Sequence, residues 1–132
     1  MSTITAFLLL CQATTSANDP FPATLKAILW VESSGNPEAI GDGGRAIGPY
    51  QIHRAYWTDA TRVLRVDWPY SDARDPVKAA AAVRAYTAHY AAHYRQPWTA
   101  ETIARIHNGG PRGWEKASTL VYWAKVAAAM GK

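Results

Sequence analysis

Residues 30–57 read WVESSGNPEAIGDGGRAIGPYQIHRAYW, and this stretch decides the fold that we predict for the chain. It continues an apolar helical pattern in which Leu25, Ile28 and Leu29 precede Glu32 at the spacing of one helix face. The pattern therefore places Glu32 on the face that packs inward. A carboxyl group in such a place tends to keep its proton, because burial disfavours the charged form.

A second carboxyl group follows in a different setting. Asp42 is surrounded by Gly41, Gly43 and Gly44, in a loop whose polar backbone can keep a carboxylate ionised. Glycoside hydrolysis uses two carboxyl groups in unlike environments, one protonated beside the leaving oxygen and the other anionic beside the sugar carbon. The pattern is thus typical of that chemistry.

Two sequence blocks carry a family resemblance. Residues 32–37 (ESSGNP) followed by residues 48–52 (GPYQI) resemble the lysozyme superfamily, and the Glu-Ser-x-Gly-Asn part is also similar to lytic transglycosylases. The GPYQI segment with residues 56–59 (YWTD) is closer to invertebrate-type, destabilase-like lysozymes. Residues 106–111 (IHNGGP) and 118–123 (STLVYW) strengthen that choice, because they occur in the order that this family shows.

The resemblance implies a muramidase that cleaves the β-1,4 bond between N-acetylmuramic acid and N-acetylglucosamine in peptidoglycan. It assigns Glu32 as the acid that protonates the leaving oxygen, and Asp42 as the group that stabilises the oxocarbenium-like state or forms a covalent intermediate. No metal or organic cofactor is implied. The residues expected to contact substrate are Tyr50, Gln51, Ile52, His107, Asn108 and Gly109.

Alternatives remain open from the residues themselves. Glu32 could be an ordinary helix-end glutamate, and Asp42 an ordinary turn aspartate, with Asp59 as the substitute carboxylate. A lytic transglycosylase would use Glu32 alone. A non-catalytic wall-binding module, or a basic interaction protein whose motifs arise by chance, would need neither carboxylate. His89 and His93 lie one helical turn apart, but no matching Glu, Asp or Cys predicts a metal site.

Composition limits the partners. The chain has 132 residues, enough for one domain with a core, and a net charge of +4 with its cations scattered. We expect a monomer that acts on peptidoglycan strands in an anionic bacterial cell wall, and no nucleic-acid partner, because no nucleic-acid motif is present. Cys11 is the only cysteine, so no internal disulfide can form, which departs from the cysteine-rich invertebrate-type lysozymes.

The elements predicted along the chain give a mainly α, lysozyme-like α+β fold: a helical bundle with a small glycine-rich loop or hairpin lobe beside the cleft. We expect the catalytic domain over residues 18–132, and a signal peptide or a packing helix over residues 1–17. The nature of that segment bears on where the protein acts. We expect a secreted, antimicrobial protein or a periplasmic one; the alternative is a protein made in the cytoplasm and released at lysis, or one associated with a virion. No segment is apolar over the eighteen or so residues that would span a membrane. Helices are expected over residues 22–34, 54–64, 76–94, 99–105 and 117–130, the last with Leu120, Trp123, Ala124 and Ala127 on one face.

Overall fold

The computed structural model describes residues 18–131, so both alternatives for residues 1–17 lie outside the part described. The predicted mainly α fold is confirmed. None of the helices within residues 18–131 combines the length and apolar character needed to cross a membrane. The helices of the described part are α2 (Phe21–Ser33), α3 (Arg54–Leu64), α4 (Pro76–His93), α5 (Ala100–Gly109) and α6 (Thr119–Met130).

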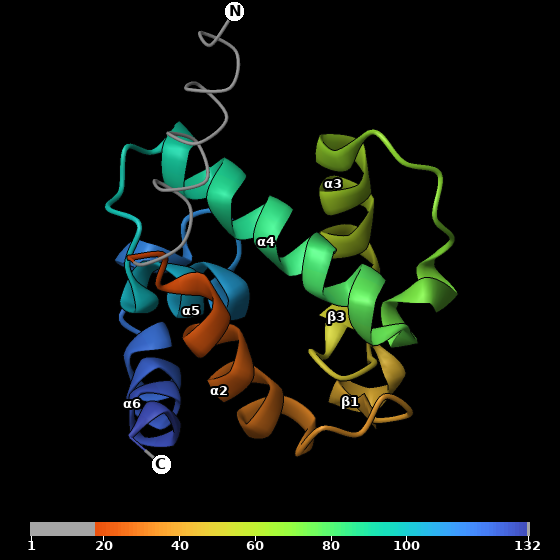
Figure 1. Ribbon diagram of the computed structural model, residues 1–132, viewed down its shortest axis with the longest axis horizontal. Coiled ribbons are helices and arrows are strands. Elements are labelled where there is room, and N and C mark those ends of the chain that lie inside the picture. The colour runs from red at the N-terminus through yellow and green to blue at the C-terminus, as the bar shows by residue number, and fades with distance from the viewer. Residues whose placement is uncertain (1–17, 132) are drawn as a thin grey trace, which may run out of the picture.

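The long helix α4 runs across the molecule, with α3 packed on it toward one end and α5 toward the other (Figure 1). Asp75 caps the start of α4, because its carboxylate accepts hydrogen bonds from the amides of Val77 and Lys78. Helices α2 and α6 lie side by side, and α5 contacts both of them. The buried core therefore joins all five helices and fixes where the ends of α2, α5 and α6 meet.

The glycine-rich segment forms a small sheet instead of only a loop or hairpin. Strands β1 (Ile40–Gly41), β2 (Ala46–Ile47) and β3 (Ile52–His53) pair antiparallel in that order. A 3₁₀ turn, η1 (Asp42–Gly44), connects the first two strands. The pairing of Ala46 with His53 brings the third strand beside that turn. One edge of the lobe therefore carries two polar side chains, those of Asp42 and His53.

Gly48 holds this lobe against the 3₁₀ helix η2 (Tyr70–Arg74). Its φ is +84°, and a Cβ atom there would lie 2.0 Å from the backbone oxygen of Ala73. We expect Gly48→Ala to lower the free energy of unfolding by about 2–4 kcal/mol, because both the left-handed backbone and the backbone clash oppose a side chain. Urea denaturation measures the change.

Gly43→Ala is the matched control for that substitution. Gly43 also has a positive φ, +65°, but a Cβ atom there would meet no atom within 4 Å. It should cost only about 1 kcal/mol, the contribution of the backbone conformation alone. Equal losses in the two variants would show that the contact with Ala73 does not constrain the lobe.

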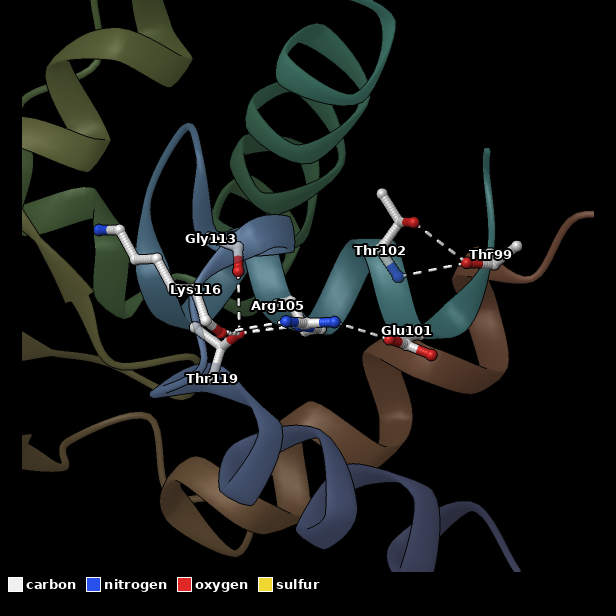
Figure 2. A network of polar contacts seen from close by, with 7 residues as sticks. All are labelled: Thr99, Glu101, Thr102, Arg105, Gly113, Lys116 and Thr119. Atoms are coloured by element: carbon white, nitrogen blue, oxygen red, sulfur yellow. Dashed lines mark hydrogen bonds and ion pairs between the residues drawn. The ribbon is translucent and has the colours of Figure 1, made fainter. Parts of the chain in front are cut away.

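One arginine links α5 to the start of α6. The guanidinium of Arg105 donates to Thr119 Oγ1 at 2.8 Å, to the Lys116 carbonyl at 3.0 Å and to Glu101 Oε2 at 2.8 Å. Thr119 in turn donates to the Gly113 carbonyl at 2.8 Å, and Figure 2 shows the whole network. These bonds fix the rotation of α6 about its axis relative to α5.

Two sequence expectations about these helices are corrected. Helix α5 continues to Gly109 instead of ending near residue 105, because Gly110 rather than an earlier residue terminates it. On α6 the buried residues are Thr119 and Val126, whereas Leu120 is exposed. The polar contacts of Thr119 turn the helix away from the face that apolar spacing predicts.

Candidate functional site

A cleft of about 450 Å³ lies where the small sheet meets the ends of the helices. Both carboxylates predicted from the sequence, Glu32 and Asp42, line it. The other lining residues are Ala46, Gln51, His53, Ala55, Tyr56, Tyr86, His107, Asn108 and Gly110. The cleft therefore combines segments from the first half of the chain with the end of α5.

Glu32 occupies the last turn of α2, where its side chain is 19% exposed. The helix ends directly after it, because Ser34 adopts a left-handed conformation and Gly35 follows with a φ of +87°. Ser33 Oγ donates to the Pro49 carbonyl at 2.7 Å, which ties this helix end to the turn before β3. The carboxyl group is thus held at the cleft wall by a rigid backbone.

Two side chains from the far end of the chain contact the Glu32 carboxyl. Tyr122 of α6 donates its hydroxyl hydrogen to Glu32 Oε2 at 2.9 Å, and His107 Nε2 of α5 lies 3.3 Å from the same oxygen. His107 is 2% exposed, and Tyr56 of α3 lies 2.8 Å from its Nδ1. Four helices therefore contribute to the surroundings of one carboxyl group.

Burial and nearby negative charge raise the pKa values of the tyrosines near Glu32. Burial raises the pKa of Tyr122, and the negative charge of Glu32 raises it further. Burial likewise raises the pKa of Tyr56 well above its ordinary value. Tyr86 stacks on Tyr56 with ring centres 3.7 Å apart, and burial raises its pKa to about 12. All three phenols therefore remain protonated at neutral pH, and Tyr122 donates its hydrogen to Glu32.

Asp42 stands in a more polar environment than Glu32. Its side chain is 49% exposed, and its oxygens contact Arg45 at 3.2 Å and His53 Nε2 at 3.0 Å. It adopts a φ of +52°, a conformation that aspartate tolerates better than most residues. The two carboxyl groups thus occupy the unlike environments that the sequence predicts.

Gln51 lines the cleft, and the nitrogen of its side-chain amide is already hydrogen-bonded within the protein. Its Nε2 donates to the carbonyl oxygens of Ala39 at 3.1 Å and Gly48 at 3.0 Å. Its Oε1 lies so close to Gly41 that a Cβ atom there would be 2.2 Å away. Since both amide hydrogens are used, Gln51 can offer a ligand only its oxygen, which is an acceptor for a sugar hydroxyl or amide hydrogen.

The other expected substrate contacts separate into two groups. Asn108 lines the cleft, as does His107. Tyr50 and Ile52 have buried side chains and belong to the core instead of the cleft wall. Gly109 packs against Thr119 of α6, and the next residue, Gly110, lines the cleft in its place. Tyr50 still shapes the site through its backbone, because its carbonyl oxygen lies 3.0 Å from His107 Nε2.

Sequence reasoning missed the roles of Tyr122, His53 and Tyr86. Tyr122 falls inside a motif block, but nothing in that block pairs it with a glutamate 90 residues earlier. His53 directly follows the GPYQI segment, and pairing of β3 with β2 is what brings it to Asp42. Asp59, the substitute carboxylate, contacts Arg62 and Tyr90 instead of lining the cleft.

Within residues 18–131, no group of three or more His, Cys, Asp or Glu side chains is placed to hold a metal ion. His89 and His93 stack on each other along α4, with ring centres 6.4 Å apart.

Comparison with known proteins gives one family match. The family model described as Destabilase matches residues 22–129, which include every residue that lines the cleft. The match therefore covers both motif blocks and nearly all of the structure described here.

Named relatives agree with that match. An invertebrate-type lysozyme of Ruditapes philippinarum is 40% identical over 81 residues, which make up 61% of this chain and 58% of that protein. A lysozyme of Magallana gigas is 37% identical over 122 residues, covering 88% of this chain and 81% of the relative. The crystal structure of Tapes japonica lysozyme superposes with a TM-score of 0.70 at 30% identity, over 80% of this chain and 86% of the other.

Proposed function

This chain belongs to the destabilase family of invertebrate-type lysozymes, and we propose that it is a muramidase that hydrolyses peptidoglycan. The bond cut is the β-1,4 linkage between N-acetylmuramic acid and N-acetylglucosamine. The observation that carries the proposal is that Glu32 and Asp42 line one cleft in unlike environments, one largely buried and the other half exposed.

Glu32 acts as the general acid. Its proton passes to the glycosidic oxygen while the bond between that oxygen and the anomeric carbon breaks, so the leaving sugar departs as a neutral alcohol. The position of Glu32 on the last turn of a packed helix supports this role, because proton transfer needs a donor held at a fixed place.

Asp42 supplies negative charge opposite the anomeric carbon, as a nucleophile or as an electrostatic stabiliser. The side chain of Asp42 is half exposed and lies 3.2 Å from the Arg45 guanidinium, a polar setting that suits this role. Glu32, now ionised, then accepts a proton from the water that attacks the anomeric carbon, which restores the enzyme and leaves a reducing end.

Substrate binding involves Gln51, His107 and Asn108 in this proposal. Gln51 supplies an acceptor oxygen at the sheet side, and Asn108 supplies an exposed amide at the helix side. The net charge of +4 supports attraction to anionic cell-wall polymers. We propose that the protein works as a monomer outside the cytoplasm or after release at lysis.

Product analysis tests the reaction class. Purified peptidoglycan is digested, and the released muropeptides are examined by mass spectrometry. We expect hydrated N-acetylmuramic acid at the new reducing ends. Products with 1,6-anhydro ends would instead show a lytic transglycosylase, and binding to peptidoglycan without release of any fragment would show a wall-binding module.

A further inference from the structure

The polar contacts of the Glu32 carboxyl all fall on one of its two oxygens. Within residues 18–131, both the hydroxyl of Tyr122, at 2.9 Å, and Nε2 of His107, at 3.3 Å, meet Oε2. General acid catalysis needs only one carboxyl oxygen free to reach the substrate. It does not by itself require contacts on the other oxygen. The two oxygens of this carboxyl group are therefore not equivalent.

His107 is fixed as a hydrogen donor at Nε2 by its other contacts. This nitrogen lies 3.0 Å from the carbonyl oxygen of Tyr50, which can only accept, so Nε2 must carry a hydrogen. The opposite nitrogen, Nδ1, faces the hydroxyl of Tyr56 at 2.8 Å. A neutral imidazole in this setting accepts from Tyr56 and donates its one hydrogen to the Tyr50 carbonyl, with Nε2 3.3 Å from Glu32 Oε2.

Tyr122 is also a donor, since burial and the charge of Glu32 raise the pKa of its phenol. One hydrogen, that of the Tyr122 hydroxyl, therefore points at Oε2, and a proton on that same oxygen would compete with it. The proton of the neutral carboxylic acid is favoured on Oε1, the oxygen without these contacts.

Building on the function proposed above, we propose that Tyr122 is a positioning residue that selects Oε1 of Glu32 as the oxygen that delivers the proton. The Tyr122 hydroxyl holds Oε2 before, during and after the transfer. When Oε1 gives its proton to the glycosidic oxygen, the charge that develops on the carboxylate already has a hydrogen-bond donor aimed at it.

This arrangement strengthens in the transition state, because hydrogen bonds to an ionised acceptor are stronger than those to a neutral one. It therefore accelerates the chemical step more than it strengthens substrate binding. Tyr122 is not among the described residues that line the cleft, so its loss should leave the contacts with substrate in place.

The other polar and titratable groups around Glu32 are the same in the wild type and in a Tyr122 variant. Tyr56 faces the cluster from α3, and Asp42 and His53 line the same cleft from the sheet lobe. Asn108 lines it from α5 but carries no charge. Since none of these changes when the hydroxyl of Tyr122 is removed, a change in pH dependence can be assigned to that hydroxyl.

Tyr122→Phe tests the proposal by removing one hydroxyl and keeping the ring. We expect the plateau kcat on soluble peptidoglycan fragments to fall about three- to tenfold, with KM within about twofold. The alkaline limb of the kcat profile should move to higher pH, because the ionised carboxylate loses a hydrogen-bond donor.

Tyr90→Phe is the matched control, since the hydroxyl of Tyr90 also donates to a carboxylate, that of Asp59, which does not line the cleft. This variant should keep the kcat and alkaline limb of the wild type. If Tyr122→Phe behaves like Tyr90→Phe, or if its alkaline limb moves to lower pH, the positioning role is wrong.

A measurement without turnover separates this proposal from the proposed function. The ¹³C signal of the Glu32 carboxyl is followed against pH in the wild type and in Tyr122→Phe. An upward move of its titration midpoint in the variant supports the contact even if the protein cleaves no peptidoglycan. An unchanged or lower midpoint overturns it, even if the wild type proves to be an active muramidase.

Discussion

Glu32→Gln is expected to lower kcat on peptidoglycan by about 100- to 10,000-fold, the usual contribution of a general acid. The amide of glutamine has no proton to transfer to the glycosidic oxygen. It has the same shape as the carboxyl group, and its oxygen can still accept the hydrogen bond of Tyr122. The fold should therefore survive, with a free energy of unfolding within about 1 kcal/mol of the wild type.

Release of reducing ends from purified peptidoglycan measures the effect, and circular dichroism during thermal unfolding checks the fold. Glu38→Gln is the matched control, because Glu38 is exposed and lies 4.0 Å from Arg74 in a surface ion pair. It should leave kcat unchanged. Activity of Glu32→Gln within a few-fold of the wild type would exclude Glu32 as the acid.

Asp42→Asn is expected to lower the rate of hydrolysis by about 100- to 1,000-fold, the scale on which a preorganised electrostatic group acts in a transition state. In the proposed mechanism Asp42 faces the anomeric carbon, and the change removes its negative charge. It also breaks the ion pair with Arg45, but that pair is largely exposed and contributes little to stability. The loss should therefore appear in kcat and not in the folded fraction.

Asp59→Asn provides the comparison, because Asp59 is the substitute carboxylate of the sequence analysis and does not line the cleft. It should retain the wild-type kcat. The products of Asp42→Asn are as informative as its rate. A variant that stays nearly as active, and releases 1,6-anhydro ends, would contradict the two-carboxylate mechanism and leave Glu32 acting alone as in a lytic transglycosylase.

The sequence was sufficient for the features that local chemistry determines. The apolar spacing before Glu32 predicts a helix that ends at the cleft, and the glycines after it predict the end. Pro76 after Asp75 predicts the start of α4, because proline suits the first helical turn and aspartate caps it. The two motif blocks also indicate the family, which the comparisons confirm.

The sequence did not predict which side chains of the motif reach the cleft. Tyr50 and Ile52 are adjacent to Gln51, yet they pack in the core while Gln51 lines the cleft. Tyr50 and Gln51 lie in the turn before β3, and Gln51 adopts a φ of +53°, so the simple alternation of an extended strand does not apply to them. Which direction faced the core depended on the helices that cover the segment.

Only the tertiary structure decided the surroundings of Glu32. Apolar spacing alone predicts a different inner face for α6, because it counts Leu120 and not Tyr122. The bonds of Arg105 to Thr119 turn the helix so that Tyr122 meets Glu32. The helical repeat is a local property that a sequence displays directly. The rotation of one helix against another follows from contacts between residues far apart in the chain, and these exist only once the core has formed.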